Sequence, residues 1–228
     1  MSVRVAAGVL LIVAPLWFNA AFALLARRFD YPTILRRSTS EILERFRAGG
    51  SSLILLWWAF MLSGLLLIAG AVLLGQTLGL NGVVVVATTF GVLAGLVQTL
   101  GLLRWVYVVP ALARDYSDPS LEPAEREVNA AVFRALHRYL GVGVGEHLGY
   151  MLTGIWSGLI GLAVIQGTAL PTWLGWPGIV IGAGLAIGSA EFLGPNEERG
   201  WHLAGTAIPV LYIAWSVWLL AMGIALIA

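Results

Sequence analysis

The fold of this chain is decided by stretches such as Leu53–Leu74, LILLWWAFMLSGLLLIAGAVLL, in which no residue is charged. The hydrocarbon core of a bilayer is about 30 Å thick, and about 20 helical residues cross it. Lipid offers no hydrogen-bond partner for backbone groups, so a segment that crosses it must be a helix or part of a closed barrel. Because this run does not alternate apolar and polar residues, it predicts a transmembrane helix.

Five further apolar runs are long enough to span a bilayer. With the first, they lie near residues 3–26, 53–74, 83–112, 140–165, 173–193 and 201–227. We therefore expect an all-α membrane protein, with six transmembrane helices in a bundle that forms a single integral membrane domain over residues 1–228. Because five spans follow the first one, we interpret the first as an uncleaved signal anchor and not as a signal peptide.

The composition excludes several classes of protein. The chain is 59% hydrophobic and 11% charged, whereas soluble domains carry about 25% charged residues. A net charge of +1 with no basic patch argues against a nucleic-acid partner and leaves the lipid bilayer as the expected surroundings. All 13 basic residues are arginine, which excludes lysine Schiff bases, and the absence of cysteine excludes thiolate chemistry and cysteine metal ligands.

The arginines predict an orientation. Most of them lie in the first and third loops, at Arg27, Arg28, Arg36, Arg37, Arg45, Arg47, Arg114, Arg126, Arg134 and Arg138. The termini and the even-numbered loops contain only Arg4. The positive-inside rule then predicts a protein of the cytoplasmic (inner) membrane, with the odd-numbered loops in the cytoplasm and both termini outside.

Both long cytoplasmic loops contain a short amphipathic segment. In the first, Ser38 and Glu41 have the spacing of a capping box before an apolar face. In the third, Val128 and Val132 begin an apolar repeat at every fourth residue. We expect short interfacial helices in both loops, with solvated connecting helices as the alternative. His137 is interpreted as a surface residue.

Three longer segments carry a resemblance to a known family. They are FDYPTILRRSTSEILERFRAGGSSLILLWWAF (29–60), GLLRWVYVVPALARDY (101–116) and GEHLGYMLTGIW (145–156). In these the chain resembles an uncharacterised family of bacterial multi-pass membrane proteins, known only as a domain of unknown function. The resemblance covers nearly the whole chain. It implies an integral membrane protein of about six helices, with no assigned activity, cofactor or catalytic residue.

Ionisable and polar residues within the spans are candidates for a site, because they are costly in lipid. Measured along their helices, they all fall in the cytoplasmic half of the bilayer. Glu146 and Tyr150 also begin a polar stripe, continued by Thr153 and Ser157, on one face of the fourth span. We expect a binding cluster that comprises Asn19, Arg104, Glu146, His147, Tyr150, Glu191 and His202.

Charge counting within this cluster predicts an ion pair. One intramembrane arginine, Arg104, accompanies two glutamates. We expect Glu146 to be the counter-ion of Arg104, with Glu191 as the alternative partner. The remaining glutamate must be protonated, paired with a histidine or open to water. A buried pair that only fixes the packing of the helices would account for Arg104 without any function.

Two glycine-rich motifs resemble nucleotide or anion loops, but their surroundings favour structural roles. GAGLAIG (182–188) lies within an apolar span with no strand before it, so helix packing is favoured over dinucleotide binding. GVGVG (141–145) could hold an anion at a helix start, but a flexible turn at the beginning of the span is favoured.

The favoured function is therefore an integral membrane protein, not an enzyme, that binds an amphipathic ligand or a membrane partner at the Arg/Glu/His cluster. A small proton-coupled transporter is the first alternative. An intramembrane metal or haem enzyme is the second, with His147 and His202 as its candidate ligands. No cofactor and no catalytic residue is predicted, and a homo-oligomer is left open.

Overall fold

The computed structural model describes residues 2–228, apart from the side chains of residues 197 and 198. The α-helices are α1 (Val3–Phe29), α2 (Thr39–Leu78), α3 (Gly82–Tyr107), α4 (Val109–Tyr116), α5 (Pro123–Leu136), α6 (Gly149–Gln166), α7 (Gly175–Gly188), α8 (Pro195–Arg199) and α9 (His202–Ile227). Three 3₁₀ turns are η1 (Thr33–Arg36), η3 (Thr172–Leu174) and η4 (Ser189–Phe192), and η2 (His137–Leu148) is π-helical. No strand occurs in the described residues.

Six of these helical stretches are long and apolar enough to cross a membrane. They are Val3–Phe29, Thr39–Leu78, Gly82–Tyr116, Pro123–Gln166, Thr172–Phe192 and His202–Ile227. The predicted all-α bundle of six spans is therefore confirmed. Several observed helices extend beyond the predicted spans, because the helical backbone continues past the point where the apolar run ends.

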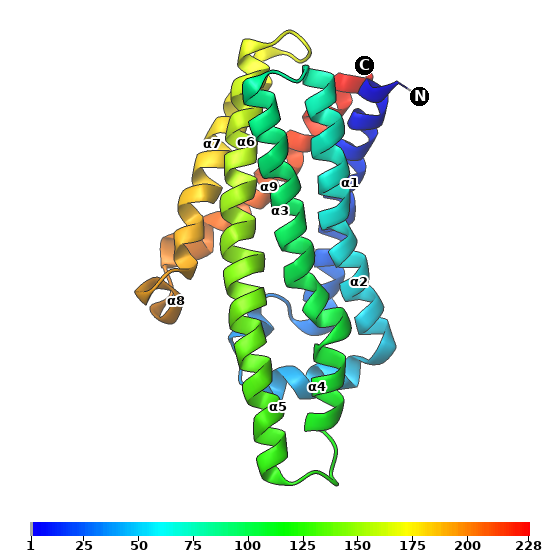
Figure 1. Cartoon of the computed structure of the whole chain (residues 1–228), viewed down its shortest axis with the longest axis vertical. Coiled ribbons are helices and arrows are strands. Elements are labelled where there is room, and N and C mark those ends of the chain that lie inside the picture. Colours follow the sequence, from blue (N-terminus) through cyan, green and yellow to red (C-terminus); the bar gives the residue numbers. More distant parts are fainter. Residues whose placement is uncertain (1) are drawn as a thin grey trace.

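The six spans form a closed ring, in which each packs on the next in chain order and α9 returns to α1. Figure 1 shows both termini at one end of this bundle, together with the turn between α2 and α3. We call this the terminal end. The other half holds the first loop, α8 and, at its tip, the turn between α4 and α5, and we call it the arginine-rich end.

Each half of the bundle has its own core. Towards the terminal end the core is mainly aliphatic, with Leu11, Leu74, Ile160, Leu219 and Met222 among its members. At the arginine-rich end it also contains a group of aromatic rings, from Phe29, Phe46, Trp57, Phe60, Trp105 and Phe133. The buried ionisable side chains thus lie towards the end whose core combines aromatic rings with aliphatic chains.

The first loop leads into a helix that bends sharply where it enters the bundle. Ser38 caps the start of α2, because its hydroxyl accepts a hydrogen bond from the Glu41 N–H at 3.3 Å. At Gly50 the backbone has φ +57°, a conformation that glycine adopts without strain. Residues 39–49 therefore lie across the end of the bundle and bury their apolar face (Figure 1). This confirms the predicted amphipathic helix in the first loop.

The third loop contains the predicted helix as α5, which continues without a break into the fourth span. Residues Pro123–Gln166 form one continuous rod of α5, η2 and α6, about 66 Å long at 1.5 Å per residue. The predicted apolar repeat faces outward, with Val128 62% exposed. The buried face instead contains Ala130 and Phe133, because Phe133 packs edge-on against Trp105 at 6.2 Å.

Glycines bring α6 and α7 into backbone contact. A Cβ added at Gly154 would lie 2.5 Å from the Gly182 carbonyl, and one added at Gly161 would lie 2.5 Å from the Gly175 carbonyl. The motif at residues 182–188 therefore serves helix packing, as predicted.

Candidate functional site

Arg104 is the most deeply buried charge of the predicted cluster, with only 5% of its surface exposed. Its Nη1 donates to the Gly101 carbonyl, and its Nη2 lies 3.4 Å from the Nδ1 of His137. The guanidinium also stands over the Trp105 ring, 5.1 Å from the centroid. Its Nε has no hydrogen-bond partner in the described part of the chain. The cation is thus held mainly by aromatic and neutral polar groups.

Gly141, the first glycine of GVGVG, makes room for this arginine, and Gly145 lets α3 approach closely. A Cβ at Gly141 would lie 2.6 Å from Arg104 Nη2, and one at Gly101 would lie 2.6 Å from the Gly145 Cα. Gly141 and Gly145 lie in the π-helical segment η2, where the wider helix continues without interruption into α6, whereas Gly101 belongs to α3. The prediction of a flexible turn is therefore wrong, because the glycines serve close packing between helices.

Glu146 does not form the predicted ion pair with Arg104. No carboxylate lies within 4.0 Å of Arg104, and Glu146 makes no side-chain hydrogen bond, within the residues that the structure describes. The charges that act on Glu146 are Arg104, then Glu191 and Arg36. The side chain is half-buried, so it is open to the surface to a limited extent. The two opposite charges are neighbours that do not touch.

Three tyrosines lie within the electrostatic reach of this carboxylate. Glu146 acts electrostatically on Tyr31, Tyr150 and Tyr212, which come from the first loop, α6 and α9. The rings of Tyr150 and Tyr212 are 5.1 Å apart and meet edge to face. Burial raises the pKa of Tyr31 above its usual value, and the charge of Glu146 acts in the same direction. The Tyr31 hydroxyl therefore keeps its proton and can act as a donor.

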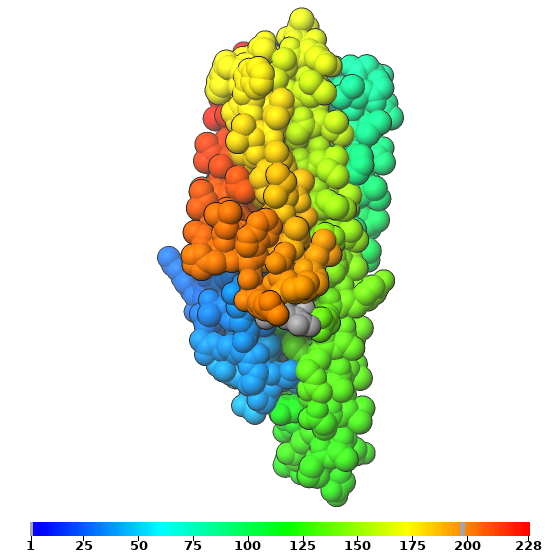
Figure 2. All heavy atoms as spheres, turned by 90° about the vertical axis from the view of Figure 1, so that its left-hand side faces the viewer, coloured from blue at the N-terminus to red at the C-terminus, as the bar shows by residue number. Residues whose placement is uncertain are grey.

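Glu191 and His147 tie three elements together beside Glu146. Glu191, on η4, pairs with Arg36 of the first loop at 3.3 Å, although Arg36 is 77% exposed. His147 Nδ1 lies 2.9 Å from the Ser189 carbonyl and so joins η2 to η4. Figure 2 shows these regions adjoining on one face, where the first loop (blue), the segment around α8 (orange) and the rod (green) meet. Glu191 is therefore engaged elsewhere and does not neutralise Arg104.

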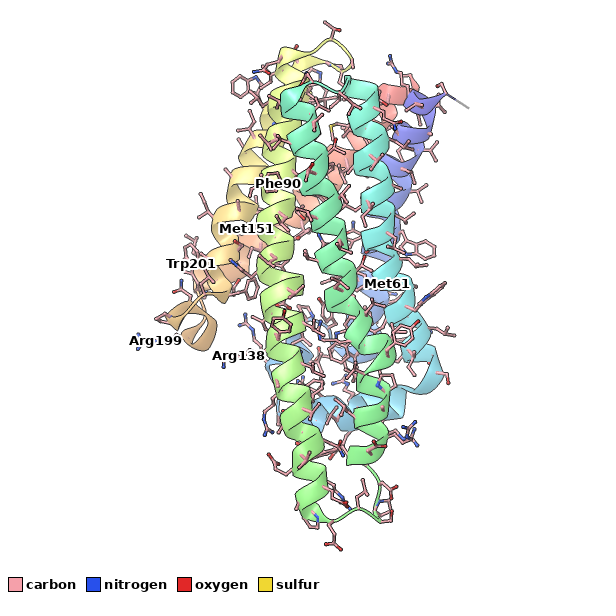
Figure 3. All side chains as sticks on the ribbon, viewed as in Figure 1. Met61, Phe90, Arg138, Met151, Arg199 and Trp201 are labelled. Carbon is pink, nitrogen blue, oxygen red and sulfur yellow. The ribbon has the colours of Figure 1, made fainter. Side chains whose placement is uncertain are left out.

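Two predicted members lie outside the group. Asn19 donates to Pro15 O at 2.7 Å and to Ser216 Oγ at 2.9 Å, and so it links α1 to α9. His202 is exposed at the first turn of α9. Figure 3 shows Arg199 at the outer edge of nearby α8, and Arg138 on the same side of the bundle. Asn19 and His202 make no hydrogen bond to the other predicted site residues within the described part of the chain.

His137, interpreted from the sequence as a surface residue, belongs to the site. Its ring stacks on Phe133 at 5.5 Å with an interplanar angle of 11°, and its Nδ1 faces Arg104. The interpretation failed because it assumed an outward face for this part of the rod, whereas the helix turns His137 and Phe133 inward together.

Residues 6–223 match the family described as a domain of unknown function, DUF4386. The match spans nearly the whole chain and includes parts of all six spans. The chain belongs to this family. No curated protein and no solved structure matches it. Membership in DUF4386 confirms the resemblance to an uncharacterised family and assigns no activity to the cluster around Glu146.

In this DUF4386 protein a column of polar groups continues from the tyrosines into the bundle. Gln98 Nε2 donates to Thr153 Oγ1 at 3.0 Å. Further along α6, Ser157 Oγ accepts a hydrogen bond from Trp215 Nε1 at 2.9 Å. Gln98 was missed in the sequence, although a lone amide within an apolar run is itself a signal.

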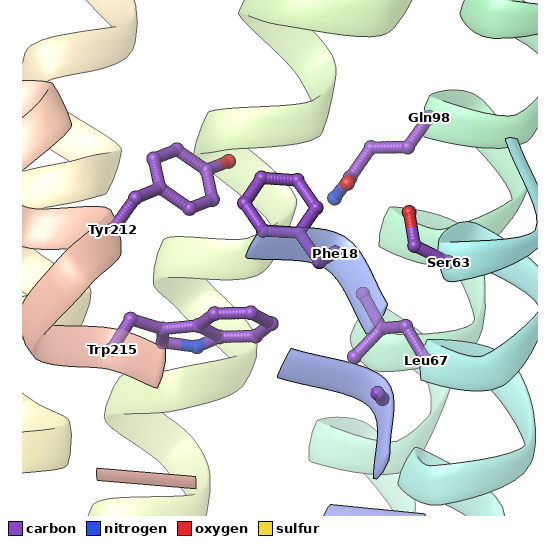
Figure 4. Close-up of a pocket in the computed structure, with 7 residues that line it drawn as sticks. Phe18, Ser63, Leu67, Gln98, Tyr212 and Trp215 are labelled. Atoms are coloured by element: carbon purple, nitrogen blue, oxygen red, sulfur yellow. The ribbon is translucent and has the colours of Figure 1, made fainter. Parts of the chain in front are cut away.

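A small cavity of about 20 Å³ adjoins this column, which is room for about one water molecule. Its walls are Ala14, Phe18, Ser63, Leu67, Gln98, Tyr212 and Trp215. Figure 4 shows Gln98 and Ser63 directed into the same space from α3 and α2. Beyond it, the buried polar side chains stop at Ser157, about 13 Å before α6 ends. The column therefore ends within the bundle.

The described residues contain no group of three or more His, Cys, Asp or Glu side chains that could hold a metal ion. His147 already uses Nδ1 for the contact with Ser189. What the arrangement offers chemically is a half-buried carboxylate, a buried cation beside it and several phenol groups.

Proposed function

We propose that this DUF4386 protein binds the polar head of an amphipathic molecule at Glu146. The observation that carries the proposal is the state of the carboxylate, which is half-buried without a hydrogen bond or ion pair among the described residues. A desolvated carboxylate without a partner is costly. Because an ionised carboxylate only accepts hydrogen bonds, the head that satisfies it must donate them.

The depth of Glu146 supports an amphipathic ligand. Twenty residues separate Glu146 from Gln166, the last residue of α6, which corresponds to about 30 Å of helix. This is about the thickness of the hydrocarbon core. Arg104, 22 residues into α3, lies at a similar depth. A ligand whose head reaches Glu146 can therefore leave its apolar chain in the lipid, and it needs no large cavity in the protein.

The neighbouring charges favour a zwitterionic head with a primary ammonium. The ammonium would donate to Glu146 and lie close to the rings of Tyr31 and Tyr150, which favours a cation. The anionic part of the head would then lie on the side of Arg104, whose Nε has no partner among the described residues. Such a ligand fills the gap between two opposite charges that do not touch.

The test compares two lysolipids, of which only one has a head group whose ammonium can donate hydrogen bonds. Lysophosphatidylethanolamine has an ammonium that donates hydrogen bonds, and lysophosphatidylcholine has none. We expect the first to raise the melting temperature of the detergent-solubilised protein more than the second. Glu146→Gln should weaken its apparent affinity about tenfold or more, as expected for the loss of a charge-assisted hydrogen bond.

Glu44→Gln is the matched control, because Glu44 is an exposed carboxylate at the same end of the bundle. It should leave the affinity unchanged. Equal affinity of the wild-type protein and Glu146→Gln for lysophosphatidylethanolamine would refute the proposed site.

Proton-coupled transport is the second candidate, and the polar column that runs inward from Glu146 favours it. Hydroxyl and amide groups with room for about one water molecule could pass protons between Glu146 and the middle of the bundle. The apolar core beyond Ser157 would then have to open in a second conformation. Proton uptake by liposomes that contain the wild-type protein, and its loss in Glu146→Gln, would favour this function over binding alone.

We also propose that the arginine-rich end faces the cytoplasm and that the protein carries no metal or haem. The first proposal rests on the distribution of arginine. The second rests on the exposed position of His202 and on the described residues, which contain no group of three or more His, Cys, Asp or Glu side chains that could hold a metal ion. A stoichiometric metal in elemental analysis of the purified protein would contradict the second proposal.

A further inference from the structure

A second candidate binding site lies at the bend of α2, outside the cluster around Glu146. A groove of about 180 Å³ opens there between α2 and α4. It is lined by Phe46, Arg47, Gly50, Ser51, Ile54, Pro110 and Arg114. The bend creates the groove, because at Gly50 the helix changes direction and leaves open space where a side chain would be.

Two arginines give the groove its positive charge. Arg47 is exposed and makes no ion pair or hydrogen bond among the described residues. Arg114 is 62% exposed at the side chain and uses its Nε for Asp115 at 3.3 Å, so its two terminal nitrogens remain available. None of the residues that line the groove is acidic. A planar guanidinium binds phosphate oxygens well, because it offers paired donors.

The floor and the depth of the groove indicate a lipid. Phe46, Ile54 and Pro110 are apolar, so the groove continues the hydrocarbon surface below the two arginines. The bend at Gly50 comes three residues before Leu53, where the uncharged run of α2 begins. Arg47 and the bend therefore lie just outside the uncharged run of α2, on the side where lipid phosphates are expected.

We propose that this groove binds an anionic phospholipid, with its phosphodiester between Arg47 and Arg114 and the start of its acyl chains on the apolar floor. The site is the electrostatic opposite of the one at Glu146, where the ligand must donate hydrogen bonds. Lipid binding here would hold the bend of α2 against α4.

The experiment measures the apparent dissociation constant of phosphatidylglycerol for the detergent-solubilised full chain, from its effect on the melting temperature. Phosphatidylcholine and inorganic phosphate are the comparison probes. Arg47→Gln/Arg114→Gln should weaken the affinity for phosphatidylglycerol at least about tenfold, since each arginine near a membrane surface contributes substantially to anionic-lipid binding. The control Arg28→Gln/Arg199→Gln removes the same charge from exposed positions at the same end, and should change the affinity less than about twofold.

The outcomes are distinct. Equal weakening in both double variants would mean diffuse attraction and no groove site, and would overturn the proposal. So would unchanged affinity in Arg47→Gln/Arg114→Gln, or full competition by inorganic phosphate, which would identify a site for free anions. If the double variant does not fold, the single variants decide, and each should weaken binding by about threefold or more.

Discussion

Among single residues, Arg104 is buried without an ion pair to any described residue. Arg104 rests on Gly141, stands over Trp105 and contacts neutral polar groups. Trp105 is itself stacked on Trp57, with ring centroids 4.5 Å apart and an interplanar angle of 9°. The delocalised guanidinium is weakly hydrated and tolerates aromatic surroundings better than an ammonium would. The stacked rings of Trp57 and Trp105 therefore line one side of the Arg104 site.

Alanine substitutions at the adjacent residues Trp57 and Trp58 test how much the stacked Trp57–Trp105 pair contributes to stability. Trp57 is fully buried, and we expect Trp57→Ala to destabilise the protein by about 3–5 kcal/mol through the cavity that it leaves. Trp58 is 44% exposed, and Trp58→Ala should cost less than about 1 kcal/mol. Denaturant unfolding in detergent, followed by circular dichroism, measures both. Similar losses in the two variants would show that the stacked pair does not dominate the stability of this end.

At the scale of elements, the π-helical segment η2 decides where Glu146 and His147 point. Its glycines let α3 approach so closely that Gly101 and Gly145 are in backbone contact. The wider turns of a π-helix rotate the residues that follow relative to an uninterrupted α-helix. In this arrangement the charge of Glu146 acts on Tyr31, Tyr150 and Tyr212, His147 faces η4, and Arg104 fits against Gly141.

Replacing two glycines of this region with alanine should have different effects on stability. In Gly101→Ala the new Cβ would meet the Gly145 backbone at 2.6 Å, so the helices must separate and the melting temperature should fall by several degrees. In Gly143→Ala the nearest atom is the Arg138 carbonyl at 3.6 Å, an ordinary contact. Alanine there should be neutral or stabilising by up to about 1 kcal/mol. A neutral Gly101→Ala would show that the close approach is not required.

At the scale of the whole molecule, charge is strongly asymmetric. Among the arginines only Arg4 lies at the terminal end, and it is held by the last turn of α9 through the carbonyls of Leu226 and Ala225. This contact caps the helix and also satisfies the one basic side chain at that end. The asymmetry determines the topology that we propose.

Single cysteines test that topology without background labelling, because the chain has no native cysteine. Ser120→Cys lies in the exposed turn between α4 and α5, and Leu80→Cys lies in the exposed turn between α2 and α3. In intact cells a membrane-impermeant maleimide should label Leu80→Cys and not Ser120→Cys, which should react only after the membrane is opened. Labelling of Ser120→Cys in intact cells would reverse the orientation and move the Glu146 site to the outer face.

The sequence predicted the six spans, the ends at which the arginines gather, the cap at Ser38 and the packing role of the glycines at 182–188. These features depend on local composition and on helix periodicity, which a single chain reveals directly. It also predicted that Arg104, Glu146, His147, Tyr150 and Glu191 belong to the same end of the bundle. Depth along a helix follows from residue number alone, because each residue advances the chain by about 1.5 Å.

Only the tertiary structure decided which of these groups meet. Glu191 pairs with Arg36, and His137 instead of Glu146 contacts Arg104. The sequence could not reveal this, because a π-helical segment and a helical rod that continues through the third loop change the direction of side chains without any change in hydrophobic pattern. Pairing depends on the rotation of each helix about its axis. That rotation is determined by packing against neighbours, here by Gly101 against Gly145 and by Phe133 against Trp105.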